Sequence, residues 1–247
     1  MKTYRADLHI HSCLSPCGAP EMTPQGIVNA ARAAGLELIA VTDHNTARMA
    51  PIVAHVAKKH GLDVFYGMEL QTREDVHLLA YFDDERLCSS FSEEVYALLP
   101  EGYVDPYGLG DQVAVDAEGN IFWREERFLV NGLDLSFRDA VDRIQELGGL
   151  AVPAHVDREF FSVSSQLGGL PKGMKFSLIE VRGPTIPTFC NGAGILRTSD
   201  AHALSAIGTR VTCITFERPS IEELRLAALG SQGRSLRGEI DDNAVKR

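Results

Sequence analysis

The sequence DLHIHS (residues 7–12) combines the pattern of a β-strand with side chains that can carry chemistry. Side chains of a strand alternate between the two faces of a sheet. Asp7, His9 and His11 are therefore expected on one face, and the leucine and isoleucine between them on the other, packed against helices. Two imidazoles on one face can chelate a cation, and Asp7 could orient one of them from behind. Two half-buried histidines without a metal would show the same pattern.

Strand-like and helix-like segments alternate outward from this stretch. We expect strands at residues 4–11, 36–41, 62–68, 75–82, 149–154, 176–181, 194–198 and 211–216. We expect helices at residues 24–34, 47–60, 136–147 and 220–229. Strands separated by helices favour parallel βα units. The prediction is an α/β fold, an irregular (β/α)7-type TIM-like barrel, with an open doubly wound sheet as the alternative. No glycine-rich nucleotide-binding motif supports that alternative.

One segment interrupts the alternation. Residues 112–116 and 121–130 flank the turn-prone stretch Ala-Glu-Gly-Asn, which predicts an inserted β-hairpin at about residues 112–130. We therefore expect a single barrel domain over residues 1–247 that carries this small hairpin. Its three aromatic residues could stack on a substrate or pack the hairpin onto the barrel.

Composition limits the classes of function. The chain has 247 residues, 45% of them hydrophobic, and a formal net charge of −10. An acidic chain is a poor candidate for stable binding of long nucleic acid, which favours a basic face. No apolar run is long enough to span a membrane, so no membrane association is expected. The five cysteines lack regular spacing, and the first residues lack an apolar signal region, so we expect a cytoplasmic protein.

Further histidines and carboxylates lie within or just after the predicted strands. They are His44 in TDHN, Glu69 in GMEL, His77, His155 in PAH, and Asp200 and His202 in SDAH. The carboxyl ends of barrel strands meet at one mouth, where active sites form. The sequence therefore predicts a metal centre there. His55 and His60 lie on a predicted helix instead and are interpreted as surface residues.

The ordered motifs DLHIHS, TDHN, GMEL, PAH and SDAH resemble the PHP (polymerase and histidinol phosphatase) family from about Tyr4 to Phe216. This resemblance implies an irregular barrel, two or three Zn²⁺, Mn²⁺ or Fe²⁺ ions, and hydrolysis of phosphate esters. It also implies a division of ligands. His9, His11, Glu69 and Asp200 would hold one ion, Glu69 with His77 and His155 a second, and His44 with His202 a third.

The chain departs from the family pattern in the loop after the first motif. Where members often have an aspartate or histidine for the third ion, this loop reads CLSPCG, which places Cys17 near that position. A thiolate suits soft or borderline ions. The alternative is a free thiol in a tight turn.

The expected mechanism is attack by a metal-bound hydroxide on a small phosphomonoester or nucleotide. Asp200 or His202 could relay a proton, and Arg158, Arg182 and Arg197 could bind the phosphate oxygens. An exonuclease or nucleotide phosphodiesterase on the same cluster is an alternative. Amidohydrolase chemistry lacks its usual lysine here, and a metal-binding regulatory module without turnover stays open. The expected partner is a small phosphorylated substrate.

Overall fold

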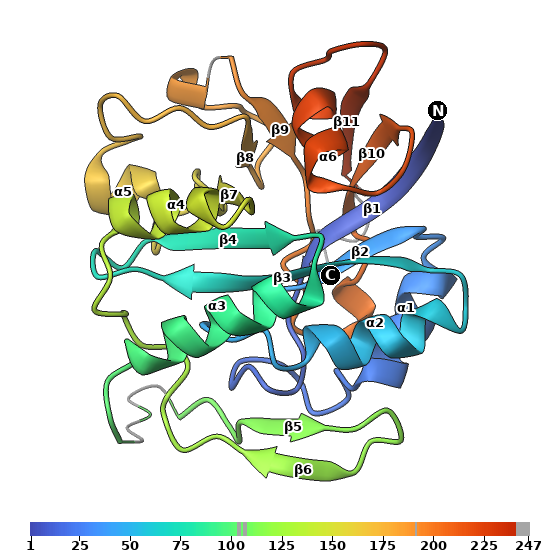
Figure 1. The fold of residues 1–247 in the computed structure, drawn as a ribbon, viewed down its shortest axis with the longest axis vertical. Coiled ribbons are helices and arrows are strands. Elements are labelled where there is room, and N and C mark those ends of the chain that lie inside the picture. Colours follow the sequence, from blue (N-terminus) through green and yellow to red (C-terminus); the bar gives the residue numbers. More distant parts are fainter. Residues whose placement is uncertain (103–104, 106–107, 191, 241–247) are drawn as a thin grey trace.

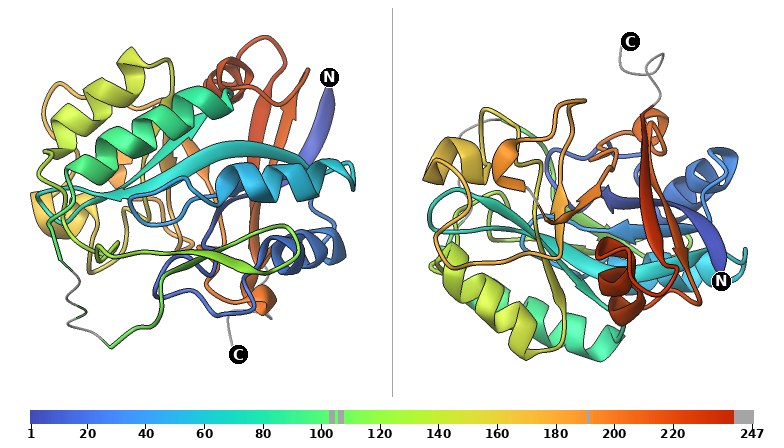
Figure 2. Two further views of the ribbon diagram at one scale, coloured as in Figure 1. Left: turned by 60° about the horizontal axis from the view of Figure 1, so that its bottom comes forward. Right: turned by 90° about the horizontal axis from the view of Figure 1, so that it is seen from above.

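The computed structural model describes residues 1–102, 105, 108–190 and 192–240. Its main sheet has seven strands in the order β11-β10-β1-β2-β3-β4-β7 (Figure 1). They are β1 (Lys2–Ile10), β2 (Leu38–Val41), β3 (Asp63–Gln71), β4 (His77–Phe82), β7 (Leu150–Pro153), β10 (Arg210–Phe216) and β11 (Ser235–Ile240). The sheet is strongly curled, as the two turned views make plain (Figure 2). The predicted TIM-like fold is confirmed at this coarse level.

A second, two-stranded sheet lies across the open side of the curl. Its strands β8 (Leu178–Glu180) and β9 (Gly194–Leu196) are parallel. On one side, the backbone N–H of Val156 donates to the carbonyl of Glu180 at 3.0 Å. On the other side, the backbone N–H of Arg197 donates to Thr212 Oγ1 at 2.8 Å. Both edges of the small sheet are thus tied to the main sheet.

The pairing of the strands corrects the expectation of parallel βα units throughout. β1–β2 and β2–β3 are parallel, but β3–β4, β4–β7, β1–β10 and β10–β11 are antiparallel. The connection from β3 to β4 is too short for the dozen or more residues that a parallel crossover needs. Asp75 forms its turn with a positive φ of 57°. This sheet therefore does not contain a regular set of seven βα units.

Six α-helices surround the sheets. They are α1 (Pro24–Ala33), α2 (Ala50–Lys58), α3 (Glu85–Ala97), α4 (Phe137–Glu146), α5 (Val163–Leu167) and α6 (Ile221–Ala228), counted over the described residues. The helices expected at residues 24–34 and 136–147 are present, and the side chains of Thr23 and Ser136 each accept a backbone N–H of the first turn. The sequence analysis did not predict α3, α5 or β11.

Two apolar clusters form the core. One gathers inward-facing side chains of the strands, among them Leu8, Leu79, Leu178 and Leu196. The other lies between the sheet and the helices and includes Ile10. Leu8 and Ile10 thus face different layers, although simple alternation predicts that they face the same layer. The register between β1 and β2 shifts between Asp7 and Ile10, and such an irregularity turns the following side chains to the other face.

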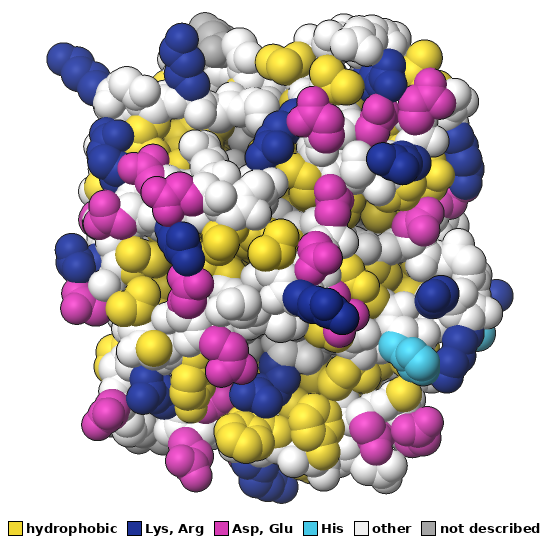
Figure 3. Space-filling view, viewed as in Figure 1, with side chains coloured by type: hydrophobic (Ala, Val, Ile, Leu, Met, Phe, Trp, Pro, Cys, Tyr) yellow, Lys and Arg dark blue, Asp and Glu magenta, His cyan; other side chains and the backbone are white. Residues whose placement is uncertain are grey.

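The expected hairpin is present as β5 (Val113–Val115) and β6 (Ile121–Arg124). Its base is joined to the ends of two main strands. Cys13 Sγ donates to the carbonyl of Val113, and the Asn45 amide donates to the carbonyl of Leu129 at 2.8 Å. Exposed hydrophobic side chains of β6 contribute to an apolar area at the lower edge of the molecule (Figure 3).

No helix among the described residues is long and apolar enough to cross a membrane.

Candidate metal centre

Four side chains meet inside the mouth of the curled sheet. His9 and His11 come from the end of β1 and the residue after it, Glu69 from the end of β3, and Asp200 from the loop after β9. His9 Nε2 and His11 Nε2 lie 3.2 Å apart. Each nitrogen is 3.3–3.4 Å from an oxygen of Glu69 and from Asp200 Oδ1. The family resemblance implied all four as ligands of one ion, and the fold brings them together.

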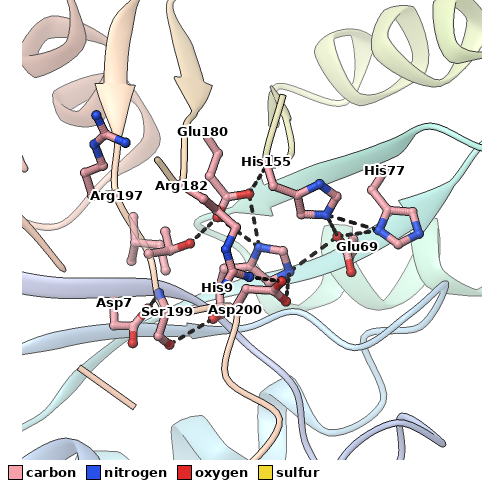
Figure 4. A network of polar contacts seen from close by, with 12 residues as sticks. Asp7, His9, Glu69, His77, His155, Glu180, Arg182, Arg197, Ser199 and Asp200 are labelled. Atoms are coloured by element: carbon pink, nitrogen blue, oxygen red, sulfur yellow. Dashed lines mark hydrogen bonds and ion pairs between the residues drawn. The ribbon is translucent and has the colours of Figure 1, made fainter. Parts of the chain in front are cut away.

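A second group shares Glu69 (Figure 4). Its Oε1 oxygen lies 2.9 Å from His77 Nδ1 and 3.1 Å from His155 Nε2. The two histidine nitrogens are 3.2 Å from each other. The outer nitrogens of both rings, His77 Nε2 and His155 Nδ1, are buried without a hydrogen-bond partner in the described structure. Glu69 therefore faces both groups, as a bridging ligand would.

The donor set fits divalent cations. Zn–N and Zn–O bonds of about 2.0–2.1 Å in a tetrahedron place neighbouring donor atoms ~3.3 Å apart. The distances of 3.2–3.4 Å around His9, His11 and Asp200 match this spacing. Facing imidazole nitrogens at 3.2 Å also need a proton or a cation between their lone pairs. These residues can hold metal ions without rearrangement.

Glu180 is a part of the centre that the sequence analysis missed. This carboxylate at the end of β8 is fully buried and lies 3.0 Å from His9 Nδ1. It also accepts the backbone N–H of His155 at 2.7 Å and the hydroxyl of Thr198. A carboxylate on Nδ1 leaves the Nε2 lone pair of His9 free for a cation. The only signal in the sequence was an acidic residue ending an apolar strand.

Asp7 has a different role from the one expected. Its carboxylate accepts the backbone N–H groups of Ser199 at 3.0 Å and Gly208 at 2.9 Å. It therefore fixes the loop that carries Asp200, and Glu180 orients the imidazole of His9 instead. Burial raises the pKa of Asp7 to about 6.

A third group lies on the other side of His11. His11, Cys17, His44 and His202 each offer one donor atom, and these atoms lie within 4.8 Å of one another. His44 is buried, and its Nδ1 is also 3.2 Å from Glu69 Oε2. The side chain of His202 is 34% exposed, so this group has access to solvent.

The charges of the cluster favour cations. Burial would raise the pKa of Glu69, but His77 and His9 hold it well below its ordinary value. Burial opposes protonation of His11, yet Asp200 and Glu69 raise its pKa to about 9. Burial lowers the pKa of His44 well below its ordinary value and that of His202 to about 4, so both imidazoles are neutral.

The three candidate arginines differ in position. Arg158 Nη1 lies 3.0 Å from Asp200 Oδ2, and Arg182 Nη1 bonds to the same oxygen at 2.5 Å. Arg197 is buried and donates to the carbonyls of Val181 and Gly183, so the expectation that it binds phosphate is wrong. It lies apart from the cluster of carboxylates and imidazoles (Figure 4).

Asn45 does not cap the helix that follows it. The N-cap of α2 is Met49, without a side-chain bond. Asn45 has a positive φ of 52°, as do His155 at 27° and Asp200 at 51°. Such angles are uncommon outside glycine and cluster where a site dictates the backbone.

Comparison with known proteins assigns these motifs to a family. A family model for the PHP domain matches residues 7–130, about half of the chain. The PolC-type DNA polymerase III of Bacillus subtilis is 38% identical over 95 residues, which cover 38% of this chain and 6% of the polymerase.

Two solved structures share the fold. A lesion-specific endonuclease from Pyrococcus furiosus has a TM-score of 0.71 at 21% identity, over 95% of this chain and 58% of its own. A protein described as a metal-dependent phosphoesterase, from Bifidobacterium adolescentis, has a TM-score of 0.52 at 19% identity, over 98% of this chain and 94% of its own. The chain thus spans less than two thirds of the polymerase and of the endonuclease.

Proposed function

This chain belongs to the PHP domain family, and from that premise we propose that it is a metal-dependent hydrolase of phosphate esters. The observation that carries the proposal is the spacing of donors around Glu69. Six side chains from five strand ends, namely His9, His11, Glu69, His77, His155 and Asp200, supply donor atoms 2.9–3.4 Å apart. Such a set is complete for two ions bridged by one carboxylate.

The residues would hold two or three ions of Zn²⁺, Mn²⁺ or Fe²⁺. Bound divalent ions supply a nucleophile at neutral pH and neutralise charge on the phosphoryl group. His9, His11 and Asp200 would bind one ion, His77 and His155 the other, with Glu69 shared. Because Glu180 occupies Nδ1 of His9, this imidazole presents Nε2 to the ion.

Asp200 couples the metal position to the phosphate position. Its Oδ1 oxygen faces His9 and His11, and its Oδ2 oxygen faces Arg158 and Arg182. The arginines would thereby lie beside bound ions, where a guanidinium group can bind phosphate oxygens. His202, which is neutral and partly exposed, is placed to give a proton path to solvent.

We assign the leading substrate class as a small phosphomonoester or a nucleotide. A terminal phosphate carries close to two negative charges at neutral pH. Two guanidinium groups beside a pair of divalent ions match that charge. The net charge of −10 disfavours long polyanions.

The second candidate is a phosphodiester of nucleic acid. The likeness to a lesion-specific endonuclease favours it, at the level of the fold. The expectation that long nucleic acid is not bound stably finds no support in that likeness. A metal-binding module without turnover is the third possibility, and the complete donor set disfavours it.

The test compares substrates after reconstitution with Mn²⁺ or Zn²⁺. Rates are measured with p-nitrophenyl phosphate, bis-p-nitrophenyl phosphate, a 5′-nucleotide and a short oligonucleotide. We expect more than one divalent ion per chain by elemental analysis and the highest kcat/KM on a monoester. Preference for the diester or the oligonucleotide would establish the second candidate. Reconstituted protein with near-zero metal would refute the proposal altogether.

A further inference from the structure

We propose that Cys17, His44 and His202 form a separate metal position whose thiolate selects zinc over manganese and magnesium. The inference rests on the metal centre of the proposed function and adds that this centre takes two kinds of ion. Its starting point is the group of donor atoms within 4.8 Å that includes these three residues and His11.

His11 does not belong to this position. Its Nε2 lies 3.3 Å from both Glu69 and Asp200, and its Nδ1 lies 3.1 Å from Ser15 Oγ. An imidazole nitrogen offers one lone pair to one ion, so His11 is used by the Glu69 centre. Cys17, His44 and His202 remain, and three protein ligands with one open position are a common zinc arrangement.

The backbone brings the Cys17 loop to both histidines. The N–H of Ala19 donates to the carbonyl of His202 at 2.8 Å. The N–H of His44 donates to Ser15 Oγ at 3.2 Å. These two bonds join the loop on either side of Cys17 to the two strand ends that carry the histidines. The thiol is therefore held in place by the fold, and no loop movement is needed to bring it to the ion.

The turn itself depends on a glycine. A Cβ atom at Gly18 would lie 2.2 Å from the carbonyl oxygen of Ser12. This contact is impossible for any other residue without moving the backbone, so the Cys17–Gly18 turn is pressed against the end of the first motif. The close approach fixes the direction in which Cys17 leaves the loop.

His44 lies between the two positions. Its side chain is buried, and its Nδ1 lies 3.2 Å from Glu69 Oε2, so this nitrogen faces the Glu69 centre. The other ring nitrogen, Nε2, is left for an ion beside Cys17 and His202.

The identity of the donors predicts which ion binds. Thiolate is a soft ligand that suits zinc, whereas oxygen ligands suit manganese and magnesium. The Glu69 and Asp200 carboxylates provide oxygen at the neighbouring positions, and the Cys17 position provides sulfur and nitrogen. Manganese is therefore expected to be accepted beside Glu69 and rejected beside Cys17.

The experiment titrates metal-free protein with Co²⁺ under anaerobic conditions and records the thiolate-to-cobalt charge-transfer absorption. This readout does not depend on turnover, so it stays informative even if phosphate esters are not the substrate. We expect the band in the wild type, its loss in Cys17→Ser, and its retention in Cys213→Ser. Cys213 is a matched control because it is a partly exposed free thiol on β10.

A competition measurement completes the test. After dialysis against excess Mn²⁺, the wild-type protein should keep one more Zn²⁺ ion per chain than the Cys17→Asp variant. The affinity of this one position for Zn²⁺ should fall more than about tenfold in Cys17→Ser, since even outer contacts of metal ligands change affinity by 10–100-fold. Cys17→Asp keeps a donor and guards against a folding defect in the serine variant. An unchanged band or unchanged zinc retention in both variants would overturn the proposal.

Discussion

Glu69 is buried at the end of β3, and both of its carboxylate oxygens face imidazole nitrogens. Oε1 faces His77 and His155, and Oε2 faces His11 and His44. A single side chain thus contacts every histidine group of the centre.

We expect Glu69→Gln to be more damaging than Cys17→Ser. Neutralising Glu69 weakens two ions at once, whereas the thiol contacts only one. Elemental analysis should show the loss of more than one ion in Glu69→Gln and of at most one in Cys17→Ser, with activity falling in the same order. Equal losses of metal and activity would mean that the ligands are divided differently.

Glu180 is the second residue for which a substitution is informative. We expect Glu180→Ala to reduce metal affinity at the His9 position by about 10–100-fold. Glu180→Gln keeps an acceptor for the N–H of His155 and should recover part of that affinity. Isothermal titration calorimetry with the metal measures the affinities of both variants. If the glutamine and alanine variants lose the same affinity, or neither loses any, Glu180 does not orient His9.

The candidate metal ligands could be predicted from the sequence because they lie at the ends of apolar strands, His77 at the start of β4 and the others near or after the end of a strand. Glu180 could not, since it lies 171 residues from His9 and pairs with it only after β8 has closed the barrel. The role of Asp7 was missed for a related reason. The irregularity after Asp7 separates its face from that of His9, and strand periodicity contains no sign of it.

At the scale of elements, Asn45 joins the hairpin to the metal-binding loops. Its amide donates to the carbonyls of Leu129 and Asn131, and its Oδ1 accepts the N–H of Gln71. One aromatic side chain of β6 adds a contact between the hairpin and the segment before α2. The guanidinium of Arg48 lies 4.6 Å from the ring of Trp123, next to α2.

We expect Asn45→Gly to lower the free energy of unfolding by about 3 kcal/mol, since three buried hydrogen bonds contribute about 1 kcal/mol each. Glycine tolerates the positive φ of 52°, so the loss reports on the side chain. Metal content should remain that of the wild type. Urea denaturation with a parallel metal assay measures both quantities. A stability loss that is accompanied by loss of metal would show that Asn45 supports the centre and not only the hairpin.

Most elements that bear the site were predictable, but their pairing was not. The strand ending at Gln71 and the strand starting at His77 are each apolar, and nothing in either sequence fixes its direction relative to its neighbour. The shortness of the connection decides in favour of a hairpin. β11 escaped prediction because its residues 235–240 include a glycine and two charged side chains.

The candidate metal centre draws its residues from across the curled sheet of the molecule. Ligands come from β1, β3 and β4 and from the ends of β7 and β9, so ions would connect both edges of the barrel mouth. Binding to the folded state alone stabilises it. Removal of metal is therefore expected to affect global stability as well as activity.

This stability should depend on pH when the metal is absent. Although burial opposes its charge, His11 keeps a proton up to about pH 9 in the metal-free protein, because Asp200 and Glu69 raise its pKa from 6.5. A raised histidine pKa stabilises the fold below the unfolded value, and the contribution is lost as the pH rises through the folded value. The free energy of unfolding of metal-free protein should fall between pH 6.5 and 9.

Metal-loaded protein should change little over the same range, because a cation takes the place of the proton. Denaturant titrations at both ends of the window, with and without Zn²⁺, measure the difference. Metal-free protein that becomes more stable toward pH 9 would contradict this assignment of charge.

The pairing of β1 with β10 has a consequence for how the protein is made. Lys2 pairs with Phe216, so β1 meets one of its two neighbours only after more than two hundred further residues are synthesised. His9 and His11 emerge early, but Asp200 and His202 emerge late. A nascent chain can therefore present only part of the ligand set. An ion would therefore meet the whole ligand set only after translation has passed residue 202.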